Sequence, residues 1–165
     1  MAKLTITGLD EYIEKLERLG KNSEGIAKQA LYEGAGIVAD EIRKEVENLP
    51  IDEKWGTPEH QATGIRKKQK KGLLGNIGDG MGISEMRKDN GVINVRIGFR
   101  GYNEIKTKRY PKGQPNRMIA RAVESGTSFS KKIPFSRKAG KWAEVPAREK
   151  IREVFEKGIE DSMKG

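Results

Sequence analysis

Four residues that could take part in catalysis lie close together in one charged stretch of the chain: Asp52, Glu53, Glu59 and His60. Carboxylate oxygens and an imidazole nitrogen are ligands for divalent metal ions, and a metal held there could activate water to cleave a phosphodiester. A metal-dependent nuclease is therefore one hypothesis. Carboxylates close together in a charged loop are commonplace, however, so the pattern alone gives this hypothesis little support.

The shortage of other reactive residue types counts against catalysis. The chain has no cysteine, which excludes disulfides, thiolate metal sites and cysteine nucleophiles. His60 is the single histidine, and one histidine cannot provide a multi-histidine zinc site. We therefore expect no enzymatic activity, no catalytic residues, no metal and no cofactor.

A cluster of glycines resembles a phosphate-binding loop at first sight: Gly75, Gly78, Gly80 and Gly82. The phosphate-binding loop of nucleotide-binding proteins continues with Gly-Lys-Ser or Gly-Lys-Thr and opens a helix. Here neither feature follows, and the next residues have the pattern of a strand. The sequence therefore does not predict a nucleotide site.

Two basic segments favour a different kind of binding. The first contains Arg66, Lys67, Lys68, Lys70 and Lys71, and the second contains Lys106, Lys108, Arg109 and Lys112. The chain has 33 Lys and Arg against 24 Asp and Glu, with a pI near 9.7, which favours an anionic neighbour such as nucleic acid. Both segments read as long loops that could contact DNA through its phosphates, although solvated arms are the alternative. Few aromatic residues lie beside them, so base stacking is poorly provided for.

The element expected to position these segments is a long amphipathic helix from Glu24 to Leu49. Residues recur along it at three- and four-residue steps and form one stripe: Ala27, Leu31, Gly34 or Ala35, Val38, Ile42, Val46 and Leu49. Ser23 is the expected N-cap, and Pro50 ends the helix. Because glycine costs roughly 1 kcal/mol in a helix, Gly34 and Gly36 predict the close approach of another backbone.

A small antiparallel sheet is expected beneath this helix. Ile93, Val95, Ile97 and Phe99 alternate with polar residues and form one buried face. Asn90-Gly91 predicts a hairpin turn with positive φ at both positions. Residues 83–86 and 4–6 are candidates for the neighbouring strands.

Further helices complete the expected fold. A first helix should run from Leu9 to Leu19, a short one should cover Met118 to Val123, and a C-terminal one should begin at Pro146. Ser128 to Glu144 is expected to be a loop or small hairpin. The sequence thus predicts an α+β fold in one domain, residues 1–165: a long N-terminal helix packed on a small antiparallel sheet, with a C-terminal helix and long basic loops.

The sequence gives no sign of a membrane protein. No apolar run approaches the ~18–20 residues of a membrane span, and the opening MAKLTITGLD lacks the apolar core of a signal peptide. We expect the protein to be cytosolic at synthesis.

Several short motifs occur in an order that resembles a known family. They are GLDEYIEKLERLG before the long helix, GLLGNI before the hairpin, AVESGTS, and VPAR before the terminal helix. The chain resembles the tail-component family of long-tailed, lambdoid-type phages and prophages. Members of this family are minor tail components that are similar to tail completion or head-to-tail joining proteins. The most specific part is Val123–Thr127, although Ser125 stands where an aromatic residue is usual. The family often has Pro-Phe directly after its Pro-Ala-Arg. In this chain either Glu149-Lys150 stands in place of Pro-Phe, or Pro134-Phe135 is the corresponding element.

The resemblance implies a structural virion protein of the head–tail neck. Such a protein would form a ring of about six copies between the connector and the tail tube, and would bind neighbouring neck or tail-terminator proteins. Residues 51–71, 100–116 and 128–144 would be loop insertions, and the basic loops could face DNA in the channel. Glu124, Gly126 and Thr127 have two interpretations: a turn stabilised within the fold, or a turn held at a subunit contact. The alternative function is a basic nucleic-acid-binding module.

Overall fold

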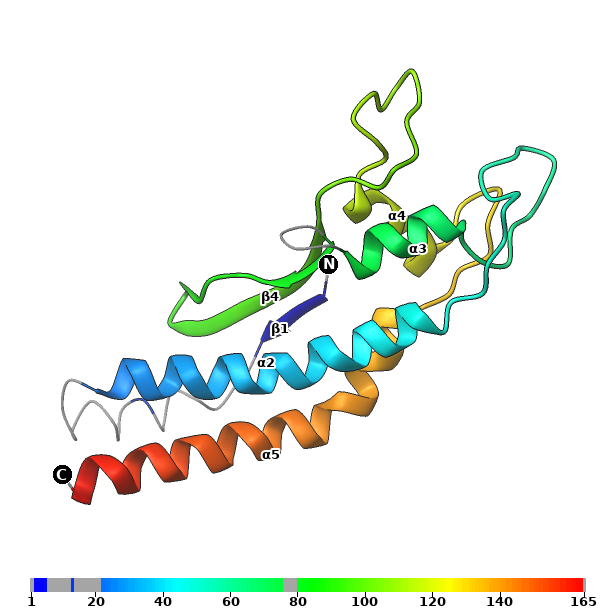
Figure 1. Ribbon diagram of the computed structural model, residues 1–165. Helices are drawn as coiled ribbons and strands as arrows, with labels where there is room; N and C mark the ends of the chain where they lie inside the picture. The colour runs from blue at the N-terminus through cyan, green and yellow to red at the C-terminus, as the bar shows by residue number, and fades with distance from the viewer. Residues whose placement is uncertain (1, 6–12, 14–21, 76–79, 165) are drawn as a thin grey trace.

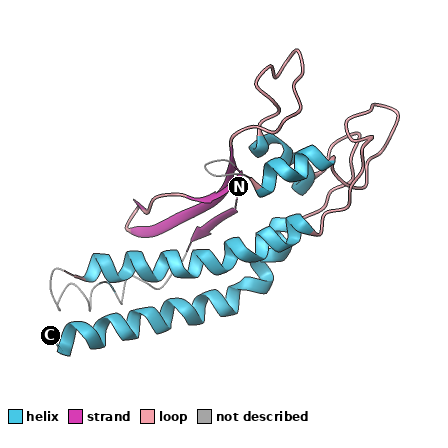
Figure 2. Cartoon of the chain, in the orientation of Figure 1, coloured by secondary structure: helices cyan, strands magenta, loops and turns pink. Residues whose placement is uncertain are grey.

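The computed structural model describes residues 2–5, 13, 22–75 and 80–164. Two long helices lie side by side and antiparallel, and a small sheet, two short helices and long loops lie on one side of them (Figures 1 and 2). The elements are β1 (Ala2–Thr5), α2 (Ser23–Glu47), α3 (Lys67–Leu74), β2 (Gly80–Ile83), β3 (Arg87–Asp89), β4 (Val92–Arg100), α4 (Asn116–Ser125) and α5 (Phe135–Lys164). The expected α+β class, with a long helix, a small antiparallel sheet and a C-terminal helix, is confirmed.

Helix α2 has the buried stripe that its periodicity predicts. Its buried residues include Ala27, Leu31, Val38, Ile42 and Val46. The predicted N-cap was wrong, because Ser23 is already helical and Asn22 precedes it with φ −93° and ψ −5°. The backbone carbonyl of Asn22 accepts a hydrogen bond from Ile26 N at 3.1 Å, but no side chain caps the helix.

Helix α5 begins at Phe135, eleven residues before the predicted start at Pro146. Residues 135–144, expected to be loop, are therefore helical. Phe135, Ala139, Ala143 and Ala147 recur every four residues and are all buried, so tertiary packing stabilises the helix across this stretch. Pro146 lies on the exposed side, where its missing N–H costs one helical hydrogen bond, and α5 bends in its N-terminal part (Figure 1).

The two long helices approach each other closely at glycines. A Cβ atom placed on Gly34 would lie 2.5 Å from the side chain of Ile151 on α5, and one on Gly158 would lie 2.5 Å from Ile26 on α2. The backbone carbonyl oxygen of Ala147 would lie 3.3 Å from the Cβ on Gly34, so the predicted close approach of another backbone is confirmed there. At Gly36 it was wrong, because nothing lies within 4 Å of a Cβ there. The α2 stripe thus packs on α5 as well as on the sheet.

Strand β4 is the centre of the sheet, with β1 on one side and β2 followed by β3 on the other. Ile97 pairs with Ile83 and Asn94 pairs with Arg87, so three residues, 84–86, oppose two on β4 and form a β-bulge. Ser84 N donates to Arg96 O at 2.7 Å within this bulge. The bulge also connects the sheet to α2, because Met86 N donates to the hydroxyl of Tyr32 at 2.9 Å.

The predicted hairpin turn between β3 and β4 is confirmed, with φ of 51° at Asn90 and 81° at Gly91. Helix α4 appears where the short helix was expected. Ile13 is helical and packs against the core, while the rest of the predicted helix from Leu9 to Leu19, together with Ile6 and Gly78, lies outside the described residues. None of the helices in the described part of the chain is both long and apolar enough to cross a membrane.

Candidate functional site

The first basic segment is mostly a helix and not the predicted loop. Arg66 N donates to Gln69 Oε1 at 2.9 Å at the start of α3. Glu53 Oε1 accepts a hydrogen bond from Lys67 N at 3.1 Å, and Leu73 is fully buried. These contacts with distant parts of the chain stabilise a helix that the repulsion between its lysines opposes.

The second basic segment is an ordered protrusion, residues 101–115, which we call the arm (Figure 1). Its base is closed by hydrogen bonds from Asn103 N to Gln114 O at 2.9 Å and from Gln114 N to Ile105 O at 3.0 Å. Thr107 and Tyr110 exchange backbone hydrogen bonds of 3.1 Å nearer its tip. The arm is thus a self-bonded loop with a fixed shape.

Buried amide side chains join the arm to α3. Gln114 Oε1 accepts from Gln69 Nε2 on α3 at 3.0 Å and from Asn103 Nδ2 at 3.2 Å. Asn103 Oδ1 accepts from Ile105 N at 2.9 Å and from Gln114 N at 3.2 Å. Gln69 and Asn103 are almost completely buried, where hydrogen bonds of this kind are strongest and most costly to lose.

Two glycines allow this close packing. A Cβ atom on Gly72 of α3 would lie 2.5 Å from Asn116 Oδ1 and 2.7 Å from Asn103 Cβ. Gly113 has φ of 115°, and a Cβ there would collide with the carbonyl oxygen of Asn103. Asn116 Nδ2 in turn donates to Arg100 O at 3.0 Å. The end of β4, the arm and α3 therefore form one packed unit.

The two predicted basic segments are brought side by side by this packing. Lys71 of α3 forms an ion pair with Glu104 of the arm at 2.6 Å, and its hydrogen bond lowers the pKa of Glu104 below the usual range. A small polar cavity of about 50 Å³ lies between the segments and is lined by Lys68, Lys71, Gly72, Gly75, Tyr102, Asn103 and Glu104. We call this surface, formed by α3 and the arm, the basic surface.

The predicted cations have different environments. Lys70 Nζ donates to Leu49 O at 2.9 Å and is engaged in the fold. Arg66 is half-buried, and its buried Nε has no hydrogen-bond partner among the described residues. Lys71 is exposed but paired with Glu104, and the other exposed cations on α3 and the arm are Lys67, Lys68, Lys106, Lys108, Arg109 and Lys112. These six side chains have access to a ligand from solvent.

The structure brings together two of the four residues considered for catalysis. His60 Nε2 lies 2.8 Å from Asp52 Oδ2, and the hydrogen bond from His60 lowers the pKa of Asp52. Asp52 also accepts hydrogen bonds from Lys54 N at 3.0 Å and Thr63 N at 3.1 Å. Glu53 instead contacts α3, and within the described residues no three His, Cys, Asp or Glu side chains are placed to hold a metal ion. The observed contacts of Asp52 and His60 stabilise the loop.

Glu124, Gly126 and Thr127 also make contacts within the fold. The carboxylate of Glu124 accepts hydrogen bonds from Ser136 N at 2.9 Å and Arg137 N at 3.2 Å, which caps the first turn of α5. Gly126 has φ of 74°, as the turn interpretation expects. Thr127 Oγ1 lies 2.8 Å from Ser130 Oγ. Their participation in a subunit contact stays a prediction.

Sequence reasoning misses two sets of surface residues. Trp142 and Val145 on α5 are 70% and 61% exposed, and both lie at or beside the stretch that the sequence predicts as a loop. Arg96 and Arg100 lie on the polar side of β4, and the alternation of the strand is the signal that could have identified them as candidates to contact a ligand.

No protein-family model, curated protein or solved structure gives a significant match to this chain.

Proposed function

We propose that the protein is a structural component of the head–tail neck of a long-tailed phage, where it completes the tail or joins it to the head without catalysing a reaction. The order of its sequence motifs supports this family. The structural observation that carries the proposal is the arm, a protrusion whose hydrogen bonds give it a fixed shape in the isolated chain. A pre-ordered arm suits a protein that must reach a neighbouring subunit, because little entropy is lost on binding.

Assembly requires a surface for neighbouring copies, and α5 has a suitable one. Trp142 and Val145 lie three residues apart on its exposed side. Tryptophan is enriched among the residues that dominate binding energy at protein interfaces. In a ring, each copy contacts the next through two different surfaces. We propose Trp142 as part of one of these surfaces, with neck and tail-terminator proteins as further partners.

The solution mass tests this proposal. Light scattering should give a multiple of the 18.4 kDa chain mass for the protein alone, or a mass above that of either component after mixing with its virion neighbours. Trp142→Ala should shift the mass toward the monomer without unfolding the chain. Ile51→Ala, which removes another exposed apolar side chain, is the matched control and should leave the mass unchanged. A strict monomer that binds none of these neighbours would contradict the proposal.

A second function, nucleic-acid binding, is favoured by one specific observation. Two basic segments that are separated in sequence lie against each other and expose six cations on one unit. Cations grouped in this way contact phosphates independently of sequence, and the affinity falls steeply with salt. Filter binding to DNA over a range of salt concentrations tests this function. Affinity no better than about millimolar near physiological salt, roughly tenfold weaker than the weak end of non-specific binding, would exclude it.

A further inference from the structure

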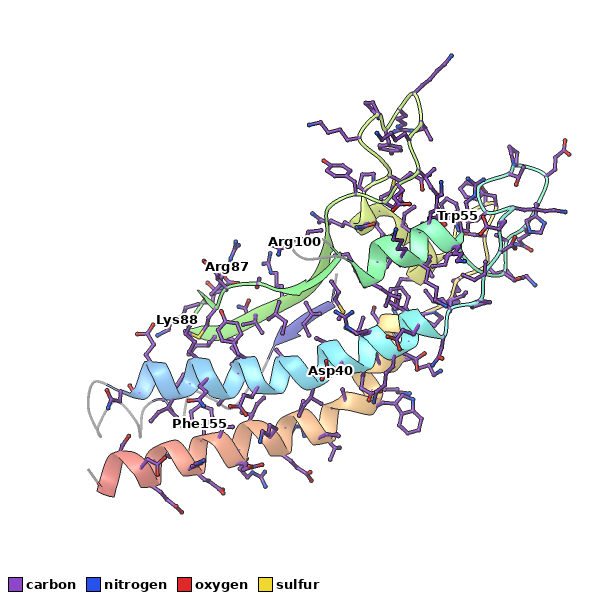
Figure 3. The ribbon with its side chains drawn as sticks, viewed as in Figure 1. Asp40, Trp55, Arg87, Lys88, Arg100 and Phe155 are labelled. Carbon is purple, nitrogen blue, oxygen red and sulfur yellow. The ribbon has the colours of Figure 1, made fainter. Side chains whose placement is uncertain are left out.

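The sheet has one covered face and one face on which no described helix lies. Val95 and Ile97 point into the core and are almost completely buried, with α2 beneath them. Arg96 and Arg100 alternate with these residues, so they belong to the opposite side of β4. Asn94 alternates in the same way but is 1% exposed, so this side is covered at Asn94 and accessible from Arg96 to Arg100. Figure 3 shows the side chains of Arg87 and Arg100 on the side of the sheet away from α2. We call this side the open face.

The open face carries three arginines that no described carboxylate neutralises. Among the described residues, neither Arg87, Arg96 nor Arg100 takes part in an ion pair. By contrast, Lys71, Lys138 and Lys150 all pair with carboxylates elsewhere in the fold. Of the nearby acidic residues, Asp89 accepts a hydrogen bond from Asn94 at 3.0 Å. Within the described residues, the guanidinium groups of the open face therefore have no carboxylate partner and could contact an external anion.

Between Arg96 and Arg100 the face is bare backbone. Gly98 of β4 pairs with Gly82 of β2, and a Cβ on Gly82 would meet nothing within 4 Å. The two arginines are four residues apart, about 13 Å along the strand. A long ligand can therefore lie close to the backbone between two positive groups. The open face offers no aromatic side chain among its described residues, so it is not suited to stacking unpaired bases.

The arm extends the same surface. Arg100 is the last residue of β4, and the arm begins at the next residue. Figure 1 shows the arm rising on the side of the sheet away from α2. The open face and the exposed cations of the arm therefore lie on one side of the molecule, where a single rod-like polyanion can contact both.

We propose that the open face binds the sugar–phosphate backbone of duplex nucleic acid through Arg87, Arg96 and Arg100, in series with the basic surface. This inference rests on the second proposed function and adds a site that the basic segments alone do not contain. Duplex is favoured over single strands because the open face offers charge and a flat floor without an aromatic side chain of its own, and the exposed ring of Tyr102 belongs to the adjoining basic surface. The open-face site is independent of the proposed ring contact, which lies on α5.

Fluorescence anisotropy with a labelled duplex of about 20 base pairs, measured over a series of salt concentrations, tests the proposal. Removing one phosphate interaction reduces the slope of log K against log salt by about 0.9. Arg96→Ser/Arg100→Ser should therefore reduce the slope by about 1.8 and the affinity by about tenfold or more at low salt. Both side chains reach the surface, and a thermal melt would verify that the variant remains folded.

Two matched variants separate the possible explanations. Arg152→Ser/Lys157→Ser removes the same charge from exposed positions of α5 and should change the affinity far less. Lys106→Ser/Arg109→Ser removes charge from the arm and should weaken binding as the open-face variant does. If only the arm variant weakens binding, the second function stands and the open-face site is refuted. Equal losses in the α5 variant would also refute it, because they would show a general charge effect.

Two further probes determine the class of ligand. A single-stranded oligonucleotide of the same length should bind more weakly than the duplex and depend less on Arg96 and Arg100. Poly-glutamate offers similar charge without the phosphate geometry. If it binds as tightly as the duplex and loses affinity in the same variant, the open face serves an acidic protein and the proposal is wrong. If the wild-type chain binds no duplex at all, both the second function and this site are refuted.

Discussion

The pair of long helices and the segment between them carry charge very differently. Helices α2 and α5 together contain 11 Lys and Arg against 12 Asp and Glu, whereas residues 50–132 contain 18 against 8. Buried polar side chains divide in the same way. All those found in the described chain, Gln69, Asn94, Asn103, Asn116 and Ser130, lie between residues 50 and 132.

This difference indicates that the helix pair and the segment between the helices are held in shape by different interactions. The helix pair is held by apolar packing, which depends on volume and tolerates small adjustments. The segment between the helices has positive charge that opposes folding, and its arm is positioned by directional hydrogen bonds between buried amides. Stability should therefore depend mainly on the helix pair, and binding mainly on the intervening segment. Each prediction below tests that division.

The largest loss of stability is expected from a substitution in the helix pair. Val38 is 4% exposed in the core between α2 and its neighbours, so Val38→Asp buries a charge without a partner. The cost, several kcal/mol, is comparable to the ~5–15 kcal/mol total stability of a domain, and the variant should be unfolded by circular dichroism. Asp40→Asn, two residues along on the exposed side of α2 (Figure 3), should fold normally. A folded Val38→Asp protein would show that the buried stripe is misplaced.

A smaller loss of stability is expected when the hydrogen bonds that hold the arm in place are removed. Asn103→Ala leaves Ile105 N without its acceptor, whereas Gln114 N keeps its hydrogen bond to Ile105 O, and leaving a buried donor unpaired costs about 1–3 kcal/mol. Hydrogen exchange at Ile105 should accelerate more than exchange in α2. Thr107→Ala, which removes one exposed hydrogen bond to Tyr110 N, should have a smaller effect. Uniform acceleration through both regions would contradict the division between them.

The contact between the two regions can be tested at Glu124. Glu124→Ala leaves the amides of Ser136 and Arg137 without their acceptor, and loss of such a cap costs about 1 kcal/mol. Urea denaturation should show this loss, with Glu124→Gln retaining part of the stability. If Glu124→Ala instead keeps its stability but changes the mass of an assembly, the subunit-contact interpretation is favoured.

Helix α2 and the turn between β3 and β4 could be predicted because their signals are local. The α2 stripe, Pro50 and the Asn-Gly turn each act within a few residues. The start of α5 could not be predicted because proline is a common first helical residue, whereas the burial of Phe135 and Ala139 that extends the helix depends on distant partners. The same limit explains why α3 was predicted as a loop. Its run of lysines is typical of a loop, and only the burial of Gln69 and Leu73 indicates a helix.

The candidate site could be predicted only in part. Its cations are evident from charge alone, but their proximity depends on a hydrogen bond between Gln69 and Gln114, 45 residues apart. It also depends on Gly72, which resembles part of a glycine-rich loop and in fact lets α3 approach Asn103 and Asn116. A single sequence contains no signal that pairs these residues.

Gly36 offers a gain in stability within the helix pair. It is in the interior of α2 and has open space where a Cβ would lie, so Gly36→Ala should stabilise the protein by about 0.5–1 kcal/mol through helix propensity. Gly34 is the comparison, because a Cβ there meets Ile151 and the carbonyl of Ala147. The midpoint of urea denaturation should rise for Gly36→Ala alone. An equal rise for Gly34→Ala would mean that the two helices are less tightly packed than the structure shows.

The smallest stability effect is expected on the basic surface. Lys68 is exposed and lines the cavity between α3 and the arm, and surface substitutions of this kind usually change stability by less than about 0.5 kcal/mol. If the intervening segment is specialised for binding, Lys68→Ala should leave the denaturation midpoint unchanged yet reduce the salt slope of duplex binding by about 0.9. Lys28→Ala on the exposed side of α2 should change neither. A Lys68→Ala variant that loses stability but no affinity would reverse the assignment, because the lysine would then belong to the fold and not to a ligand site.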